Sequence, residues 1–405
     1  MSADLGPGFR RYWFGEAVSR FGDEITILAL PWLVASDTGS PLAVGALEAF
    51  AFLPIVLFGL VIGVVADRRP RRRSMIQADM VRVVLLATVP LVVLADGRAP
   101  LAQVLAVAFC AGLAKLLFDA SAQAFVVDLV PRSELVPANS RIALTDGAAT
   151  IAGPGLAGVL IAIAGAAGAV AVDAGTFAVS AIAVSLVIVT RDTRSDARPS
   201  VGAAAREGIR FIVRQPVLLA STCLSTGVNL AGGMFSALVV IFLQQTVGLS
   251  GWQAGIVFAA NGAGIMVASR IAPRLARSGL GRTILVGTAI AAVGFLVFAG
   301  TTDTLWGLTA VGGMALIGLG TGFALIANAS LRQRVVPGEL LGRVTASSAV
   351  VFRGALPVGA IIGGLIGEAA GIRAGLLTLA CLYSLVAIGG ALSPLRGNDP
   401  APVEA

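Results

Sequence analysis

The chain has 405 residues, of which 57% are hydrophobic and 13% are charged, and its net charge at pH 7 is +7. Soluble globular domains contain about 25% charged residues, so this composition excludes an ordinary soluble protein and indicates one that crosses a membrane many times. The basic residues are scattered over short segments between apolar ones, which argues against nucleic acid as a partner.

Neither a metal nor a cofactor is indicated. The three cysteines lie in separate apolar segments without paired spacing, so we expect no disulfide and no metal site. The chain has no His, so any proton transfer must use carboxylates. It also lacks a nucleotide-binding loop and a catalytic constellation, so we expect neither an ATP-driven protein nor an enzyme.

Twelve apolar segments of membrane-spanning length are separated by charged or Gly- and Pro-rich breaks. They occupy residues 12–36, 42–66, 74–96, 101–127, 139–165, 168–190, 217–245, 252–273, 283–301, 304–330, 343–368 and 372–393. This pattern predicts an all-α membrane protein of twelve transmembrane helices. We expect an N-terminal six-helix half at 1–190, a cytoplasmic linker at 191–216, a C-terminal six-helix half at 217–393 and a cytoplasmic tail at 394–405.

Polar residues form a stripe along the first predicted helix, because they recur at steps of three and four residues. The stripe consists of Glu16, Ser19, Arg20, Asp23 and Thr26. Ionisable side chains at membrane depth are costly and usually functional. Burial opposes the ionisation of a carboxylate and a nearby Arg favours it, so Asp23 is the first candidate for a proton carrier. Glu24 and Asp119 are the alternatives, and a static Arg20–Asp23 ion pair is the competing interpretation.

The third and fourth predicted helices each carry two opposite charges at ion-pair spacing. Asp79 and Arg82 are three residues apart, and Lys115 and Asp119 are four apart. A structural role is the simpler interpretation of both pairs, although Lys115 and Arg20 are also the cationic candidates for proton coupling.

The remaining charged residues within the predicted spans differ between the two halves. The second and fifth helices carry Glu48 and Asp146, whereas the spans of the second half carry Arg270 and Arg353 but no carboxylate well inside. Four acids near the outer ends of spans are expected to be solvated: Asp96, Asp173, Asp303 and Glu368.

The linker contains a basic amphipathic pattern. Arg206, Arg210 and Arg214 recur at four-residue steps opposite Phe211 and Ile212. This spacing favours a helix lying on an anionic membrane surface. A helix packed on the protein's own cytoplasmic face fits the pattern equally well.

The distribution of Arg predicts the orientation. One set of loops and the linker collect most of the Arg residues, whereas the opposite loops hold only Arg98 and Arg373. Short cytoplasmic loops are enriched in Lys and Arg. We therefore expect both termini in the cytoplasm and a multi-pass protein of the plasma or inner membrane, surrounded by its lipids.

The two halves also repeat each other. Residues 130–158 and 336–364 both run from a Val-Pro turn and a Glu, through a helix rich in small residues, to a Pro and closely spaced Gly. Halves repeated about an axis along the membrane normal are typical of transporters, so the two halves are expected to be pseudo-symmetric.

The segment between the second and third helices carries a family signature. Its residues Gly63, Asp67, Arg68, Arg71 and Arg72 match the pattern G-x-x-x-D-R-x-x-R-R. The chain thereby resembles the major facilitator superfamily, and the resemblance covers all twelve spans. Pro70 departs from the small residue usual there, and the corresponding stretch of the second half, 269–282, has no Asp.

Within that superfamily, the fifth helix is similar to the Gly-Pro motif of proton-driven antiporters. The motif residues are Gly147, Gly153, Pro154 and Gly158. The first helix with the following "TGSPLAVG", and "VPANS" before the fifth, look like the group of macrolide-efflux and enterobactin-export proteins. We interpret Gly153 and Pro154 as a hinge, with plain helix packing as the alternative.

The resemblance implies roles for particular residues. The family's loop Asp binds a helix N-terminus of the other half and closes the cytoplasmic side, which here assigns Asp67 to the start of the eleventh helix near Arg343. The alternative is that the neighbouring Arg residues only set topology. Helices one, four, seven and ten line the family's cavity, which places Asp23 and Asp119 on one wall. The other wall would comprise Asn229, Met234, Phe235, Met314, Phe323 and Asn328.

We therefore expect a monomeric, proton-coupled exporter of a hydrophobic or amphipathic small molecule such as a drug, an antibiotic or a secondary metabolite. Export of a siderophore and uptake of a nutrient are the alternatives within the same fold. A receptor or scaffold that transports nothing is the alternative from another class, and it would not need buried carboxylates.

Overall fold

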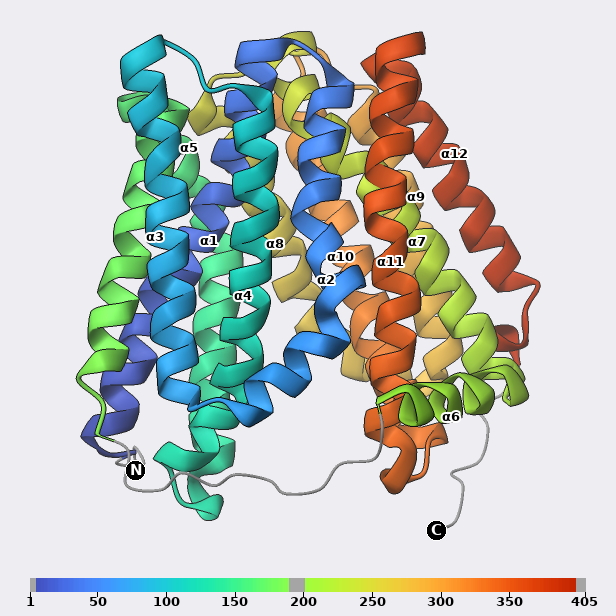
Figure 1. Cartoon of the computed structure of the whole chain (residues 1–405). Helices are drawn as coiled ribbons and strands as arrows, with labels where there is room; N and C mark the ends of the chain where they lie inside the picture. Colours follow the sequence, from blue (N-terminus) through green and yellow to red (C-terminus); the bar gives the residue numbers. More distant parts are fainter. Residues whose placement is uncertain (1–4, 189–200, 398–405) are drawn as a thin grey trace. The chain divides into compact units, whose positions relative to one another are not determined.

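The computed structural model describes residues 5–188 and 201–397, and over these residues the chain is almost entirely helical and forms no strand (Figure 1). The first part of the predicted linker and most of the predicted tail lie outside the described residues. The expected all-α architecture is confirmed.

The helices lie close to the predicted segments. Their bounds are α1 (Gly6–Thr38), α2 (Pro41–Arg68), α3 (Arg71–Asp96), α4 (Leu101–Leu129), α5 (Leu135–Ser185), α6 (Val201–Arg214), α7 (Pro216–Ile241), α8 (Gly251–Leu275), α9 (Leu280–Ala299), α10 (Trp306–Val335), α11 (Gly338–Ala370) and α12 (Ile372–Ala391). A π-helical turn, Phe242–Thr246, extends α7.

The element α5 is two helices joined at Gly165. This residue has φ 72° and ψ 169°, a conformation that glycine adopts readily and that a residue with a Cβ avoids. The break falls between the predicted segments 139–165 and 168–190, so α5 contains the fifth and sixth expected spans.

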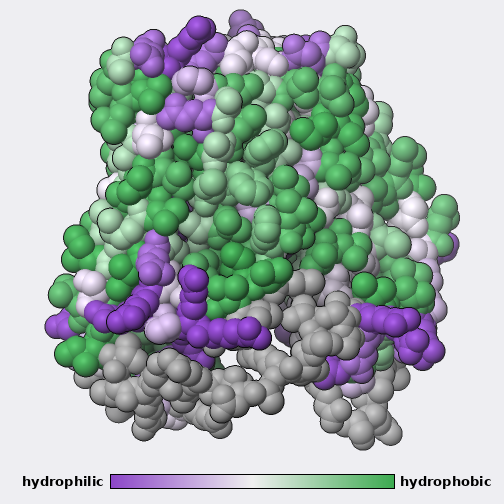
Figure 2. Space-filling model, viewed as in Figure 1, coloured by the Kyte–Doolittle hydropathy of each residue, from purple (hydrophilic) through white to green (hydrophobic). Residues whose placement is uncertain are grey.

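Among the described residues, ten helices are long and apolar enough to cross a membrane. That number counts α5 once and leaves out α1, whose middle carries Arg20, Asp23 and Glu24. With the second part of α5 and with α1, the twelve predicted spans are present. On the face shown in Figure 2, hydrophobic side chains cover the middle of the molecule and hydrophilic ones gather toward its two ends. Such a surface suits a lipid environment.

The described residues divide into two compact units. Unit 1 comprises residues 5–38, 50–188 and Ser250–Gly255, and unit 2 comprises residues 39–49, 201–249 and 256–397. Unit 2 therefore includes the start of α2, and unit 1 includes the start of α8.

In each unit, a glycine of another helix allows close packing against one of these helix starts. In unit 1, a Cβ built at Gly158 of α5 would overlap the backbone of Gly251 in α8. In unit 2, a Cβ at Gly364 of α11 would meet the Pro41 carbonyl oxygen of α2 at 3.0 Å. Gly158 and Gly364 occupy equivalent positions in the two repeated stretches. Small residues of this kind let membrane helices approach backbone to backbone.

The helix of the linker, α6, packs on α11 and α7 of unit 2. Ile212 is buried, whereas Arg206, Arg210 and Arg214 are exposed. Glu207 forms an ion pair with Arg343 of α11. Of the two interpretations of this segment, the structure thus shows a helix packed on the protein's own helices.

Candidate functional site

Unit 1 contains a cluster of charged side chains contributed by α1, α3, α4 and α5. The stripe predicted on α1 supplies the residues at its centre, because its three- and four-residue steps place them on one face. The members are Glu16, Arg20, Asp23, Asp79, Arg82, Lys115, Asp119 and Asp146.

Asp23 lies between two cations from neighbouring helices. Arg82 of α3 donates to Oδ1, and Lys115 Nζ of α4 donates to Oδ2 at 2.5 Å. The Asp23 side chain is 17% exposed. The interpretation of a static Arg20–Asp23 ion pair is therefore wrong, because the partners of Asp23 come from α3 and α4.

Arg20 instead joins three helices. Its guanidinium lies 3.3 Å from a carboxylate oxygen of each of Glu16, Asp119 and Asp146. These acids belong to α1, α4 and α5. Because Asp119 also pairs with Lys115 at 3.7 Å, one continuous chain of charges runs from Asp146 through the side chains around Asp23 to Asp79.

The two predicted ion pairs within single helices are present but shared. Asp79 Oδ1 lies 3.5 Å from Arg82 Nη1, and Lys115 lies near Asp119. Each cation also binds Asp23, so neither pair is closed on itself. The Arg82 guanidinium further stacks on the Phe177 ring, 3.4 Å from its centroid, in a cation–π contact.

Two acids near this cluster are completely buried, and only one of them has hydrogen bonds. Asp173 accepts hydrogen bonds from the hydroxyls of Thr26 and Thr176. Both Asp79 carboxylate oxygens lack a hydrogen-bond partner. The expectation that Asp173 is solvated is wrong, since the second part of α5 packs against α1 at Gly22.

The predicted Gly-Pro motif lies against the charged helix. Glu24 accepts a hydrogen bond from the Thr150 hydroxyl of α5 at 3.4 Å. One turn on, a Cβ built at Gly153 would overlap the Glu24 Cβ, and Pro154 is buried. A Cβ at Gly147 would meet nothing within 4 Å. Gly153 therefore provides the space that Glu24 occupies, while Gly147 has no comparable role in packing.

Two arginines of the signature segment bind other helices of unit 1. Arg71 donates to Asp128 Oδ2 of α4 at 2.6 Å. Arg72 donates to the carbonyl oxygens of Val184 and Ser185, at the end of α5. The last carbonyl groups of a helix lack partners within it and form its negative end, so a guanidinium there is favourable.

The other signature residues show fewer contacts. Arg68 is exposed, and a Cβ at Gly63 would meet nothing within 4 Å. The side chain of Asp67 lies outside what the structure describes. Its gating role stays a prediction.

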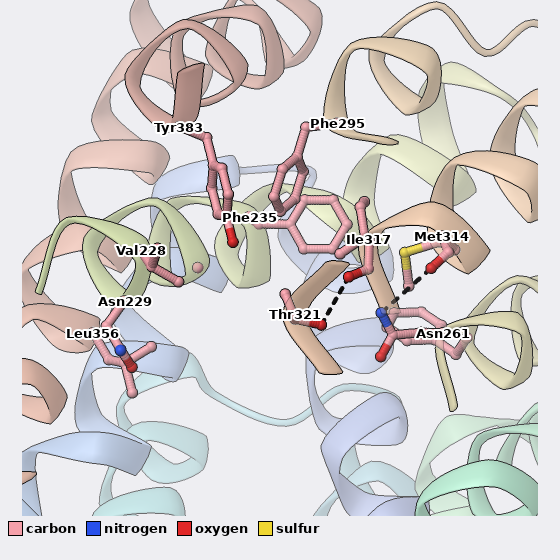
Figure 3. Close-up of a pocket in the computed structure, with 12 residues that line it drawn as sticks. Val228, Asn229, Phe235, Asn261, Phe295, Met314, Ile317, Thr321, Leu356 and Tyr383 are labelled. Atoms are coloured by element: carbon pink, nitrogen blue, oxygen red, sulfur yellow. Dashed lines mark hydrogen bonds between the residues drawn. The ribbon is translucent and has the colours of Figure 1, made fainter. Parts of the chain in front are cut away.

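Unit 2 contains an uncharged pocket of about 320 Å³ (Figure 3). Its lining comes from α7 to α12: Val228, Asn229, Gly232, Phe235, Phe258, Asn261, Phe295, Met314, Ile317, Thr321, Leu356 and Tyr383. Asn229, Phe235 and Met314, three of the predicted cavity residues, thus meet at one site.

The other three predicted cavity residues lie elsewhere in unit 2. Met234 is buried and faces Gly363 of α11. Phe323 is buried with Ala268 and Ala272 in a separate cluster. The Asn328 amide accepts a hydrogen bond from Ser221 at 2.6 Å and donates one to Ser225 at 2.9 Å, so its polar groups are used between helices.

Unit 2 also contains a carboxylate from the first half of the sequence, whereas the spans of the second half have none well inside them. Glu48 lies on the start of α2, which belongs to this unit. The expected division into a charged and an uncharged half therefore holds for the pocket, but unit 2 as a whole has an acid within it.

Comparison with known sequences decides the family. The Major Facilitator Superfamily matches residues 12–358 of the chain. The chain belongs to the Major Facilitator Superfamily. The resemblance read from Gly63 to Arg72 is thereby confirmed, and the protein is a multi-pass membrane protein of a transporter superfamily.

Several relatives are efflux proteins. "Multidrug efflux pump Tap" of Mycolicibacterium fortuitum is 28% identical over 410 residues, which cover 96% of each chain. "Macrolide efflux protein A" of Streptococcus pyogenes is 22% identical over 383 residues, which cover 94% of each chain. The predicted similarity to the efflux group of the superfamily is confirmed.

Solved structures share the fold. The nucleoside transporter NupG has a TM-score of 0.77 at 11% identity, covering 96% of this chain and 99% of its own. A bacterial homologue of the iron transporter ferroportin in an inward-facing state has a TM-score of 0.75 at 16% identity, covering 95% and 98%. At such identities the likeness shows the superfamily fold alone.

Sequence reasoning missed Asp128 in unit 1 and nine of the twelve residues that line the pocket of unit 2, among them Phe295 and Tyr383. Asp128, the partner of Arg71, had a signal in its position as an acid at the end of the fourth predicted span. Tyr383 had one as well, because it is one of two tyrosines in the chain and lies within an apolar span. Phe295 had no such signal, since phenylalanine is common in spans.

Proposed function

We propose that the protein exports a hydrophobic or amphipathic small molecule, of the drug or antibiotic type, in exchange for protons. The observation that carries the proposal is Asp23, a carboxylate at membrane depth that two cations from different helices share. A receptor or scaffold would not need this arrangement. The efflux relatives, which match nearly the full chain, support the direction of transport.

The charge cluster supports a proton step at Asp23. A proton on this carboxylate would remove the charge that Arg82 and Lys115 share. Each cation already has a second acid within 4 Å, Asp79 for Arg82 and Asp119 for Lys115, so the cations would turn to these acids. Loss of the proton would restore the pairing with Asp23. Coupling then consists of a repeated exchange of partners among the charges of this cluster.

Glu24 is the second candidate for the proton carrier. Its one hydrogen bond among the described residues is the long one from Thr150, and it packs directly on Gly153 of the antiporter-like motif. A change in its charge would act on the α1–α5 contact. The comparison of Asp23→Asn with Glu24→Gln decides between the two.

The pocket of unit 2 supports the substrate assignment. Its lining carries no charged side chain, so binding there depends on buried apolar area, at about 25 cal/mol per Å². We assign Asn229, Phe235 and Met314 to substrate contact.

We also propose the orientation predicted from the Arg distribution, in which both termini lie in the cytoplasm. The end of α2 that carries the signature residues Asp67 and Arg68 is then cytoplasmic.

The test is transport by the purified protein in liposomes with an imposed pH gradient. Chloramphenicol and Hoechst 33342 serve as an uncharged and an amphipathic substrate. We expect accumulation in liposomes with an acidic lumen, collapse of that accumulation by a protonophore, and proton release from the lumen on addition of substrate. Equal accumulation of substrate with and without the pH gradient contradicts antiport. Accumulation only in liposomes with an alkaline lumen contradicts export.

A further inference from the structure

Tyr383 of α12 has a buried hydroxyl group without a hydrogen-bond partner. The residue is 1% exposed, and the hydroxyl oxygen makes no hydrogen bond within the described residues. The other tyrosine of the chain, Tyr12, is equally buried, but its hydroxyl is not among the unpaired buried groups. Buried polar groups are nearly always satisfied because an unpaired one costs free energy. An unpaired hydroxyl therefore requires an explanation.

The hydroxyl points into the pocket of unit 2, beside the ring of Phe235 (Figure 3). The other polar side chains of the lining donate to backbone carbonyl groups. Asn229 donates to Ser225 at 2.8 Å, Asn261 to Met314 at 3.4 Å and Thr321 to Ile317 at 2.7 Å. Each of these side chains uses one donor hydrogen within the protein, whereas the Tyr383 hydroxyl uses none and is available to a ligand in the pocket.

The rest of the lining is apolar and aromatic. The rings of Tyr383 and Phe295 have centroids 4.9 Å apart, and those of Phe295 and Phe235 are 5.1 Å apart. This arrangement fixes the Tyr383 ring, and with it the position of the hydroxyl. A volume of about 320 Å³ lies within the range of small-molecule pockets. A charged ligand would find no counter-charge in this lining, so an uncharged ligand fits it best.

We propose that this pocket binds an uncharged, largely apolar molecule that carries a hydrogen-bond acceptor such as a carbonyl oxygen, and that Tyr383 donates its hydroxyl hydrogen to that acceptor. The step from ligand to exported substrate rests on the proposed function. Binding itself does not. Tyr383 is then a residue that determines specificity, because it favours a ligand with an acceptor over a hydrocarbon of the same shape.

Equilibrium binding to the purified full-length protein tests the proposal. Two fluorescent naphthalenes serve as ligands: 6-propionyl-2-dimethylaminonaphthalene, which has a ketone, and its 6-propyl analogue, which lacks it. For Tyr383→Phe we expect the Kd of the ketone to rise about 3- to 10-fold, which is the usual value of one neutral hydrogen bond. The Kd of the propyl analogue stays unchanged. The emission of the bound ketone shifts to the blue when its hydrogen bond is lost.

Thermal unfolding separates this role from a structural one. The unfolding midpoint of unliganded Tyr383→Phe is expected to equal or exceed that of the parent protein, since no internal hydrogen bond is removed. The matched control is Tyr12→Phe, which removes the hydroxyl of the other buried tyrosine, in unit 1 and outside the pocket. It should leave the Kd of both naphthalenes unchanged.

Three results overturn the proposal: an unchanged Kd for the ketone, an equal rise in Kd for both naphthalenes, or a lower unfolding midpoint for Tyr383→Phe. The first two mean that the hydroxyl does not bind the acceptor, and the third means that it has a partner within the protein. All these measurements are made without a pH gradient. A failure of proton antiport leaves them unaffected, and their failure leaves antiport standing.

Discussion

Units 1 and 2 arise from repeated stretches of sequence but differ in what lies between their helices. Unit 1 contains a chain of ion pairs from Asp146 to Asp79, and unit 2 contains a pocket without a charged lining residue. Helix packing through Gly158 and Gly364 is nevertheless alike in both. Similar helix packing therefore supports a charged cluster in one unit and an uncharged pocket in the other, because small residues on the packing faces leave the other faces free to differ.

The largest effect is expected from Asp23→Asn. The amide keeps the shape of the carboxylate but cannot carry the proton, so gradient-driven export should fall to background while downhill exchange of substrate continues. Transport in liposomes, with and without a pH gradient, measures both activities. Asp303→Asn, at an exposed position, is the control that should retain export. Gradient-driven export by Asp23→Asn would move the proton step to Glu24, and Glu24→Gln would then be inactive.

Arg82→Met should break the charge cluster itself. It leaves Asp23 with one cation and Asp79 with none within 4 Å, and removing one partner of a buried pair costs about 3–5 kcal/mol. Thermal unfolding of the detergent-purified protein should show a much lower midpoint. Arg98→Met changes an exposed residue and should have no effect. Equal midpoints for the two variants would mean that the ion pairs of Arg82 contribute nothing to stability.

Gly153→Ala tests how unit 1 makes room for its acids. The added methyl group would overlap the Glu24 Cβ, and such overpacking costs about 1–3 kcal/mol. Gly147→Ala lies in the same helix and meets no atom within 4 Å, so it should be neutral or stabilise the helix by up to about 1 kcal/mol. The midpoints of the two variants measure the difference, and a destabilised Gly147→Ala with an unaffected Gly153→Ala would contradict the packing described for α5.

The smallest effect concerns the pocket of unit 2. Phe235→Ala removes a lining ring, so we expect changes of a few-fold in the relative export of different substrates, with proton coupling retained. Phe323→Ala lies outside the pocket in a buried cluster. It should instead cost about 3–5 kcal/mol of stability without reordering the substrates. Export of a substrate panel alongside unfolding midpoints separates the two, and a reordering caused only by Phe323→Ala would place the substrate elsewhere.

Most of the fold was predictable because its signals are local. Apolar segments of membrane length, separated by charged or Gly- and Pro-rich breaks, placed the spans to within a few residues, since each transmembrane helix satisfies its own backbone. The stripe on α1 was predictable for the same reason, because helical periodicity is a property of neighbouring residues. The family signature was also local, and the match over residues 12–358 confirmed it.

The partners of those residues were not predictable. The competing interpretation paired Asp23 with Arg20, three positions away, yet Asp23 binds Arg82 and Lys115, which are 59 and 92 positions away. Asp173 was placed in solvent from its position near a span end, yet it is buried against α1. In both cases the position along the chain was a poor guide, because a helix bundle brings together residues that are far apart in sequence.

The sequence by itself determined which segments are long apolar helices, that the first helix carries a polar stripe, and to which superfamily the protein belongs. Hydrophobicity and the 3.6-residue period specify these features within single helices. Only the tertiary structure decided which cations share Asp23, which predicted cavity residues meet in one pocket and that the Tyr383 hydroxyl is left without a partner. These depend on which faces of distant helices pack together, and that packing minimises the free energy of the whole bundle rather than of any one segment.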